Sequence, residues 1–273
     1  MVTSVIDKSM TAGTSDAAAV LVTVAKVEGS GPREPGAWML VGTNFEVVGT
    51  IGGGRLEFDA LAVARDVLAN RSSPATHRYS LGPSLSQCCG GVVYLRYDLV
   101  PEAELDALRT RLASPGTPFA LFGGGHVGRA IVRACADLPF AVTWIDSRDE
   151  IFPAQVPANV RCEHSDPVHV GVRDLDPGSL VLAMSFSHAE DLDVIAACLQ
   201  RRRERDDLPF VGLIGSKTKW ATFRHRLADR GFTEAELAAV QCPIGIPGIG
   251  GKEPAVIAAS AVAQLLLART TPT

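Results

Sequence analysis

The pattern of apolar and polar residues divides the chain into two parts near residue 115. Before that point, short apolar stretches typical of strands alternate with two segments that have apolar residues at helical spacing. The expected strands are residues 18–27, 38–41, 46–49, 78–81 and 92–97, and the expected helices are residues 56–68 and 101–112. This mixture predicts a small N-terminal α+β domain at residues 1–113.

The second part of the chain has a regular alternation of strand and helix. The expected strands are residues 119–122, 141–145, 179–184 and 210–214, and the expected helices are residues 127–138, 192–201, 217–230 and 254–268. Such alternation is typical of a doubly wound parallel sheet, so we expect a Rossmann-like C-terminal domain at residues 119–273. The Ser-, Pro- and Gly-containing stretch 114–118 is the expected linker, and the whole chain is of the α/β class.

Composition and charge narrow the classes of function. The 273 residues carry a formal net charge of -4, and the one run of arginines, at 201–203, is followed at once by acidic residues. Nucleic-acid binding is therefore not expected. The most apolar stretch, 255–268, is short for a membrane span, so no membrane association is expected either. Six cysteines without a secretory context indicate reduced thiols in the cytoplasm.

Three glycine clusters precede expected helices: Gly52–Gly54, Gly123–Gly125 with Gly128, and Gly248 with Gly250 and Gly251. Glycine lets a backbone approach a ligand closely, and the start of a helix offers unpaired N–H groups. Together these features form a site for phosphate or another anion.

The second cluster fits the pattern G-x-G-x-x-G through its glycines Gly123, Gly125 and Gly128. A strand precedes the cluster, a helix follows it, and Asp146 stands 18 residues later at the end of the next expected strand. This arrangement predicts Rossmann geometry and a possible NAD(P) site in which Asp146 bonds a ribose hydroxyl. The alternative is a loop that serves only as a tight turn. His126 lies at the ligand end of the loop, and its alternative is simple solvation.

Polar residues also follow two later strands of the C-terminal domain. His188 follows the strand at 179–184, and Lys217 follows the strand at 210–214. Ligands of such sheets bind outside the carboxyl ends of the strands, so both side chains are candidate ligand contacts. The alternatives are a capping or core histidine and a solvated surface lysine.

The first domain contains two further candidate elements. The loop Gly52, Gly53, Gly54 could bind an anion through its backbone N–H groups, and Arg55 could add a bidentate contact. Glu57 could accept a hydrogen bond from a ligand, or it could simply complement the helix dipole. Cys89, in the pair Cys88-Cys89 before two glycines, is a candidate nucleophile or ligand of a soft metal, with burial as a small apolar side chain as the alternative.

Taken together, these motifs resemble the XdhC/CoxI family of xanthine dehydrogenase accessory proteins. The matching segments are 28–36, 49–57, 89–91, 122–128, 146–148, 211–217 and 242–245, and the resemblance covers almost the whole chain, from about residue 20 to residue 267. One departure is Ser185-Phe186, where the family often has Thr-His, and the paired Cys88 is not expected throughout the family.

The resemblance implies a chaperone for the molybdenum cofactor (molybdopterin) rather than an enzyme. Such a protein binds the cofactor, supports its sulfuration with a cysteine desulfurase and delivers it to the molybdenum-binding subunit of xanthine dehydrogenase or a related hydroxylase. Cys89 is the expected molybdenum contact. A homodimer is compatible with this function, but neither the oligomeric state nor the client enzyme follows from the residues. The rival hypotheses are an NAD(P)-dependent oxidoreductase and a purely structural assembly factor.

Overall fold

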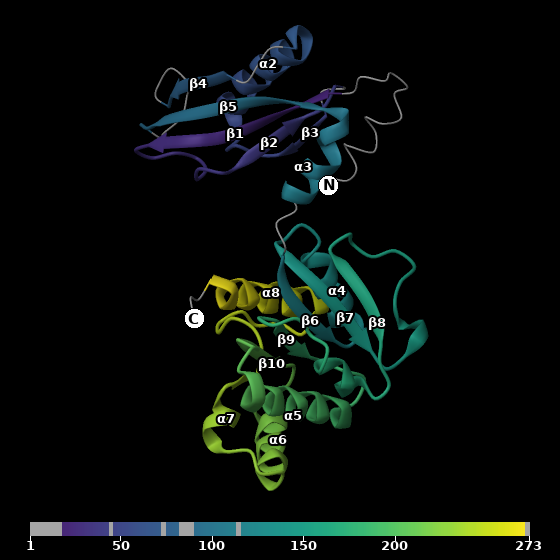
Figure 1. Cartoon of the computed structure of the whole chain (residues 1–273). Coiled ribbons are helices and arrows are strands. Elements are labelled where there is room, and N and C mark those ends of the chain that lie inside the picture. The colour runs from purple at the N-terminus through teal and green to yellow at the C-terminus, as the bar shows by residue number, and fades with distance from the viewer. Residues whose placement is uncertain (1–17, 44–45, 72–74, 82–89, 113–115, 271–273) are drawn as a thin grey trace. The chain divides into compact units, whose positions relative to one another are not determined.

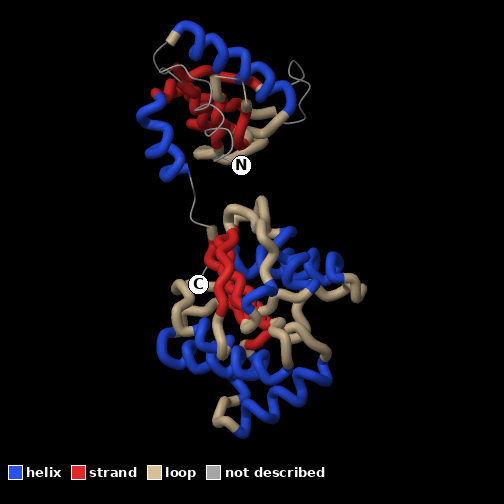
Figure 2. The backbone as a smooth tube through the Cα atoms, turned by 90° about the vertical axis from the view of Figure 1, so that its right-hand side faces the viewer, coloured by secondary structure: helices blue, strands red, loops and turns tan. Residues whose placement is uncertain are grey.

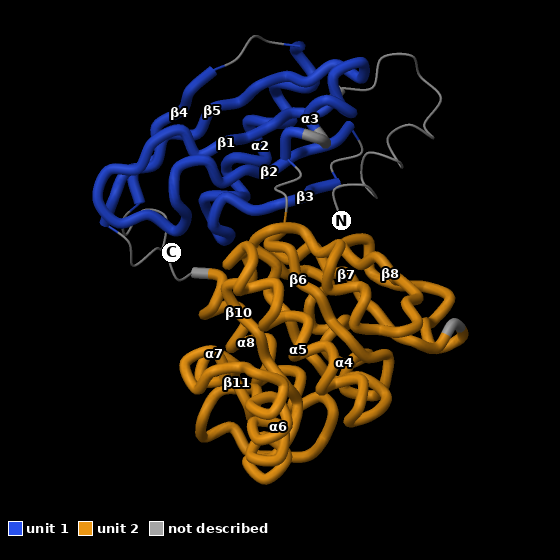
Figure 3. The backbone as a smooth tube through the Cα atoms, turned by 60° about the horizontal axis from the view of Figure 1, so that its bottom comes forward, with its two compact units in different colours: residues 1–113 blue, residues 114–273 orange. Residues whose placement is uncertain are grey.

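The structure is a computed structural model that describes residues 18–43, 46–71, 75–81, 90–112 and 116–270. The chain forms two compact units, Met1–Ala113 and Ser114–Thr273, which Figure 3 distinguishes by colour. The parallel sheet of the second unit and the α+β character of the first confirm the sequence prediction, and the sheet of the first unit is antiparallel.

The N-terminal unit contains an antiparallel sheet with the strand order β3-β2-β1-β5-β4. Its elements are β1 (Ala18–Glu28), β2 (Trp38–Val41), β3 (Val47–Gly49), α2 (Gly54–Asn70), β4 (Ala75–Ser80), β5 (Val92–Pro101), η2 (Glu102–Glu104) and α3 (Leu105–Leu112). Along β1, alternate residues point to opposite faces of the sheet. Val20, Val22 and Val24 therefore pack with α2, whereas Ala19 and Leu21 pack with α3.

The C-terminal unit contains a parallel sheet with the order β11-β10-β9-β6-β7-β8. Its elements are β6 (Thr117–Phe122), α4 (His126–Ala134), β7 (Phe140–Asp146), η3 (Asp149–Ile151), β8 (Val160–His164), η4 (Val168–Val172), β9 (Leu180–Ala183), α5 (His188–Arg205), β10 (Phe210–Leu213), α6 (Lys217–Asp229), α7 (Glu234–Ala238), β11 (Val240–Gln241) and α8 (Pro254–Thr270). Counted from β6, this is the Rossmann order 3-2-1-4-5-6, whose switch point lies between β6 and β9.

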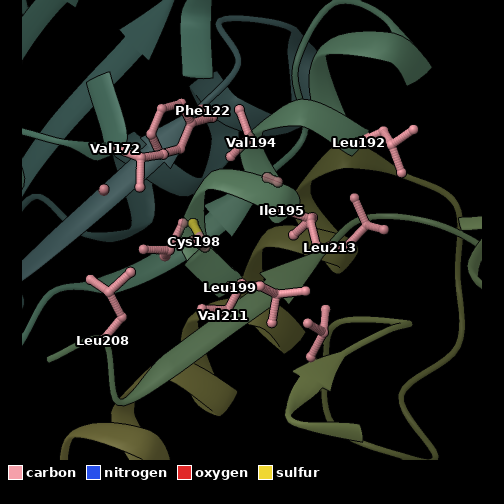
Figure 4. Packing of buried hydrophobic residues seen from close by; sticks show 14 of the residues in the cluster. Phe122, Val172, Leu192, Val194, Ile195, Cys198, Leu199, Leu208, Val211 and Leu213 are labelled. Carbon is pink, nitrogen blue, oxygen red and sulfur yellow. The ribbon is translucent and has the colours of Figure 1, made fainter. Parts of the chain in front are cut away.

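Helices cover both faces of the parallel sheet (Figures 1 and 2). On one face, α4 and α8 pack against each other and against buried residues such as Trp144 and Leu182. On the other face, α5 contributes Val194, Ile195 and Cys198 to a second buried cluster, part of which appears in Figure 4. These two layers hold the carboxyl ends of β6, β7, β9 and β10 at one edge of the sheet.

Several boundaries differ from the sequence prediction. Helix α2 begins at Gly54, so Gly54 and Arg55 belong to its first turn and not to the preceding loop. Thr117, expected in the linker with Pro118, instead begins β6, where both residues pair with β7. Helix α4 ends at Ala134, four residues early. Strand β5 continues to Pro101, where a helix was expected to begin.

Candidate functional site

Three motif segments of the N-terminal unit meet at one end of its sheet. A Cβ built at Gly91 would lie 2.3 Å from the carbonyl oxygen of Ser30 and 2.7 Å from that of Glu28. Likewise, a Cβ at Gly52 would lie 2.5 Å from Pro32. The segment after β1 therefore contacts both the start of β5 and the glycine loop before α2. Segments that are far apart in the sequence thus form one glycine-rich edge, defined here as residues 28–36, 49–57 and 90–91.

The side chain of Glu57, in the first turn of α2, forms hydrogen bonds with the preceding glycine loop. Its Oε1 accepts hydrogen bonds from the backbone N–H groups of Ile51 (3.0 Å) and Gly53 (2.9 Å) and from the hydroxyl of Thr50. Burial raises the pKa of Glu57, but these hydrogen bonds outweigh it and leave the pKa below its ordinary value. The carboxylate is an internal anion that takes two of the N–H groups expected for a ligand, so phosphate contacts at Ile51 and Gly53 would require Glu57 to move.

Other parts of the same edge face outward. A Cβ at Gly53 or at Gly90 would meet no atom within 4 Å, so the backbone is open at both positions. The side chain of Arg55 is 59% exposed, and its Nε lies 2.9 Å from Oδ1 of Asp59, one turn later in α2. A cationic group and bare backbone are therefore available to a ligand that approaches from the surface. Cys88 and Cys89 lie outside the described residues.

The glycine loop of the C-terminal unit has the geometry of its motif. Gly123 has a φ of +125°, and its carbonyl oxygen accepts a hydrogen bond of 2.9 Å from the indole of Trp144. A Cβ at Gly128 would lie 2.1 Å from that same carbonyl oxygen, so Gly128 permits the close contact of α4 with the loop. Gly125, at the start of α4, has open space around it. The three glycines have the roles of the Rossmann motif: Gly123 forms the tight turn, Gly125 leaves room for a ligand to approach the backbone, and Gly128 permits close packing of the helix.

Asp146 does not present a free carboxylate. Its Oδ2 accepts from the N–H of Gly124 (2.6 Å) and from Nη2 of Arg148 (2.9 Å), and its Oδ1 accepts from the backbone N–H (3.0 Å) and Nε (2.8 Å) of Arg148. The side chain is 1% exposed. Burial raises the pKa of Asp146, yet the bonds from Arg148 and Gly124 outweigh it and lower the pKa overall. Asp146 was expected to form hydrogen bonds with a ribose, but in the structure it forms them with Gly124 and Arg148.

The remaining predicted residues lie at helix starts. His126, His188 and Lys217 are the first residues of α4, α5 and α6, and all three are exposed. The ring of His188 lies edge-on to that of Phe223, with 6.3 Å between their centroids. These residues belong to the carboxyl edge of the sheet, as expected.

A buried ion pair that sequence reasoning missed lies at this edge. Nζ of Lys219 is 2.6 Å from Oδ2 of Asp191 and 2.9 Å from the carbonyl oxygen of Ile214. The sequence drew attention to Lys217, two residues earlier, because that residue opens the helix. The signal that favours Lys219 is the helical register of α6, which places residue 219 on the same side as buried Phe223.

The described residues contain no group of three or more His, Cys, Asp or Glu side chains arranged to hold a metal ion. Within the same residues, no helix is both long and apolar enough to cross a membrane.

Comparison with known proteins decides the family. The profile of the XdhC Rossmann domain matches residues 119–265, more than half of the chain, and that of the XdhC and CoxI family matches residues 14–80. The chain belongs to the XdhC family. The resemblance inferred from the motifs is thereby confirmed.

Two relatives extend this result. A solved structure of a xanthine dehydrogenase from Bacillus halodurans superimposes with a TM-score of 0.75 and 21% identity over 96% of this chain and 95% of that one. At this identity the match shows that the fold is shared. The uncharacterized protein YqeB of Escherichia coli (strain K12) is 29% identical over 87% of this chain. The chain spans 41% of the length of YqeB.

Proposed function

We propose that the chain is an accessory protein of xanthine dehydrogenase, or of a related molybdenum hydroxylase, and that the molybdenum cofactor is its cargo. Membership of the XdhC family supports the accessory role. The observation that favours cofactor handling is the glycine-rich edge of the N-terminal unit, where the family's separate motif segments meet.

The chemistry of this edge fits a phosphorylated, anionic cargo. A Cβ at Gly53 or Gly90 would meet no atom, so a ligand can approach the backbone there, and Arg55 supplies a cation two residues after Gly53. Guanidinium groups bind phosphate through paired hydrogen bonds. The ion pair of Arg55 with Asp59 is on the surface and is therefore weak enough to exchange for a phosphate. In this proposal Gly54 and Arg55 hold the phosphate, Gly53 joins them once Glu57 leaves its N–H group, and Cys89 faces the molybdenum.

The proposed role extends to partners. The client is the molybdenum-binding subunit of the dehydrogenase, and a cysteine desulfurase supplies the sulfur for cofactor sulfuration. The protein acts in the cytoplasm without turning over a substrate of its own. A homodimer is the proposed assembly.

The test measures cargo on protein purified from cells that make the cofactor. Molybdenum is measured by elemental analysis, and pterin by its fluorescence after oxidation. Arg55→Ala should lower the occupancy of both by about tenfold, because it removes a charged contact. Arg96→Ala is the matched control, since Arg96 is 58% exposed and pairs with Asp98 at 2.8 Å. It should bind cargo like the wild-type protein.

The outcomes separate the two parts of the proposal. Wild-type protein that carries neither molybdenum nor pterin would refute cofactor binding. If the client dehydrogenase also kept its activity with Arg55→Ala and Cys89→Ala, a purely structural assembly role would replace the proposed role in cofactor handling. Equal losses of cargo in Arg55→Ala and Arg96→Ala would remove the glycine-rich edge as the binding site.

A further inference from the structure

Arg148 bonds Asp146, the residue at the position that decides whether a Rossmann domain accepts a dinucleotide. In a dinucleotide-binding domain, the acid at the end of the second strand bonds the ribose hydroxyls. A carboxylate has about four acceptor sites. In this chain Gly124 uses one and Arg148 uses three, through its backbone N–H, its Nε and its Nη2. Asp146 has no acceptor left for a ribose while Arg148 remains bound to it.

The same arginine also spans the end of the central strand. Strands β7 and β9 lie on either side of β6, and a dinucleotide must cross the end of β6 to reach both. The guanidinium carbon of Arg148, after β7, lies 4.5 Å from the ring centroid of Phe186, after β9. Beside it, the hydroxyl of Ser147 donates to Oε1 of Glu190 at 2.6 Å. These two contacts join the segments across the path of the dinucleotide.

The segment after Arg148 covers the glycine loop as well. A Cβ at Gly124 would lie 2.5 Å from the side chain of Ile151, so Ile151 packs directly on the loop. Arg129 fixes this arrangement, because its Nη2 donates to the carbonyl oxygen of Ile151 (2.7 Å) and its Nε to that of Gly124 (3.3 Å). Ile151 therefore narrows the space beside Gly124 and Asp146.

We propose that Arg148 is a specificity-determining residue that excludes nicotinamide dinucleotides from this Rossmann domain. It does so by saturating Asp146 and by stacking on Phe186 across the end of β6. Phe186 is 68% exposed, and the guanidinium of Arg148 lies over its ring. NADP is excluded by the same arrangement, since the two guanidinium nitrogens that would meet a 2′-phosphate are bound to a carboxylate. The inference concerns the C-terminal unit and does not depend on the cargo proposed for the N-terminal unit.

The test is a gain of binding. NADH and NADPH are titrated into the full-length protein by fluorescence and calorimetry, up to about 1 mM. Wild-type protein should show no saturable binding. Arg148→Ala should bind NADH at least about tenfold more tightly than the wild-type limit, because it frees the Phe186 ring and the two acceptors of Asp146 that the Arg148 side chain occupies. The control is Arg161→Ala, which removes the same charge from a side chain that is 70% exposed on β8, and it should behave like the wild type.

A second variant guards against loss of folding. Arg148→Gln retains a neutral hydrogen-bond donor for buried Asp146. If thermal unfolding shows that Arg148→Ala is not folded, the binding of NADH by Arg148→Gln tests the proposal instead. Saturable binding of NADH or NADPH to the wild-type protein at micromolar concentration would overturn the proposal. Folded Arg148 variants that bind no better than Arg161→Ala would overturn it equally.

Discussion

Lys219 and Asp191 form a buried ion pair that joins two strand ends to two helices. Their charged atoms are 2.6 Å apart, and the side chains are 12% and 3% exposed. The other oxygen of Asp191 accepts the N–H of Ser185 at 2.6 Å, and Lys219 also bonds the carbonyl oxygen of Ile214. Segments that follow β9 and β10 are thus tied to α5 and α6 through one pair of charges.

Lys219→Met should destabilise the protein strongly. The substitution leaves the buried carboxylate of Asp191 without its cation, and removing one partner of a buried pair typically costs about 3–5 kcal/mol. The control is Lys217→Met, because Lys217 is exposed, and its effect should stay within about 0.5 kcal/mol. Thermal and urea unfolding measure both variants, and equal stability of the two would contradict the structural role of Lys219.

Glu57→Gln should destabilise the N-terminal unit in a pH-dependent way. Near neutral pH the loss of charge-assisted hydrogen bonds from Ile51 and Gly53 should cost about 2 kcal/mol. Because the folded pKa of Glu57 is lowered, its contribution is complete above the unfolded value of about 4.3 and is lost as the pH falls through the folded pKa. The stability difference between wild type and variant should therefore be constant from neutral pH to about pH 5 and shrink below it. A difference that grows in acid would refute this assignment.

Two glycines of the Rossmann loop should respond differently to alanine. Gly128→Ala places a methyl group 2.1 Å from the carbonyl oxygen of Gly123, so α4 must shift, at a cost of about 2 kcal/mol. Gly125→Ala meets no atom within 4 Å at a φ of -68°, and its cost should stay below about 1 kcal/mol. Melting temperatures of both variants test the pair. A larger loss for Gly125→Ala would show that the loop is packed differently.

Two buried thiols should be inert in the folded protein. Burial raises the pKa of Cys135 and of Cys198 to about 12, so at pH 8 only about one molecule in ten thousand carries the thiolate at either residue. Iodoacetamide should therefore leave both unmodified until the protein is unfolded in urea. Mass spectrometry of peptides after a timed reaction gives the rate at each cysteine. Rapid native labelling of Cys198 would mean that the core around α5 opens readily.

Much of the architecture could be predicted from the sequence because strongly apolar strands alternate with amphipathic helices. Strand β8 was missed for a physical reason: it lies at the edge of the sheet, and Val160 is its one fully buried residue. Strand β11 is also an edge strand and has only two residues. Edge strands bury few side chains, so the apolar pattern that reveals a central strand is weak in them.

The site was predictable in its components but not in its internal bonding. The glycine motif and Asp146 were found by spacing, and their positions in the fold agree with it. The pairing of Asp146 with Arg148, and of Glu57 with the loop before α2, depends on side-chain conformations that spacing does not encode. Both acids looked available to a ligand in the sequence, and both satisfy backbone N–H groups of their own chain in the structure.

The contact of Gly91 with the carbonyl oxygens of Glu28 and Ser30 affects how the cysteine motif is interpreted. Any side chain at position 91 would separate β1 from β5, so this glycine is required whether or not Cys89 ever meets a metal. A search that relies on the Cys-Gly-Gly pattern would therefore retrieve proteins that share this close contact between paired strands, with or without the chemistry. Exchanging Cys89 while keeping Gly91 is the way to separate the two contributions in any member of the family.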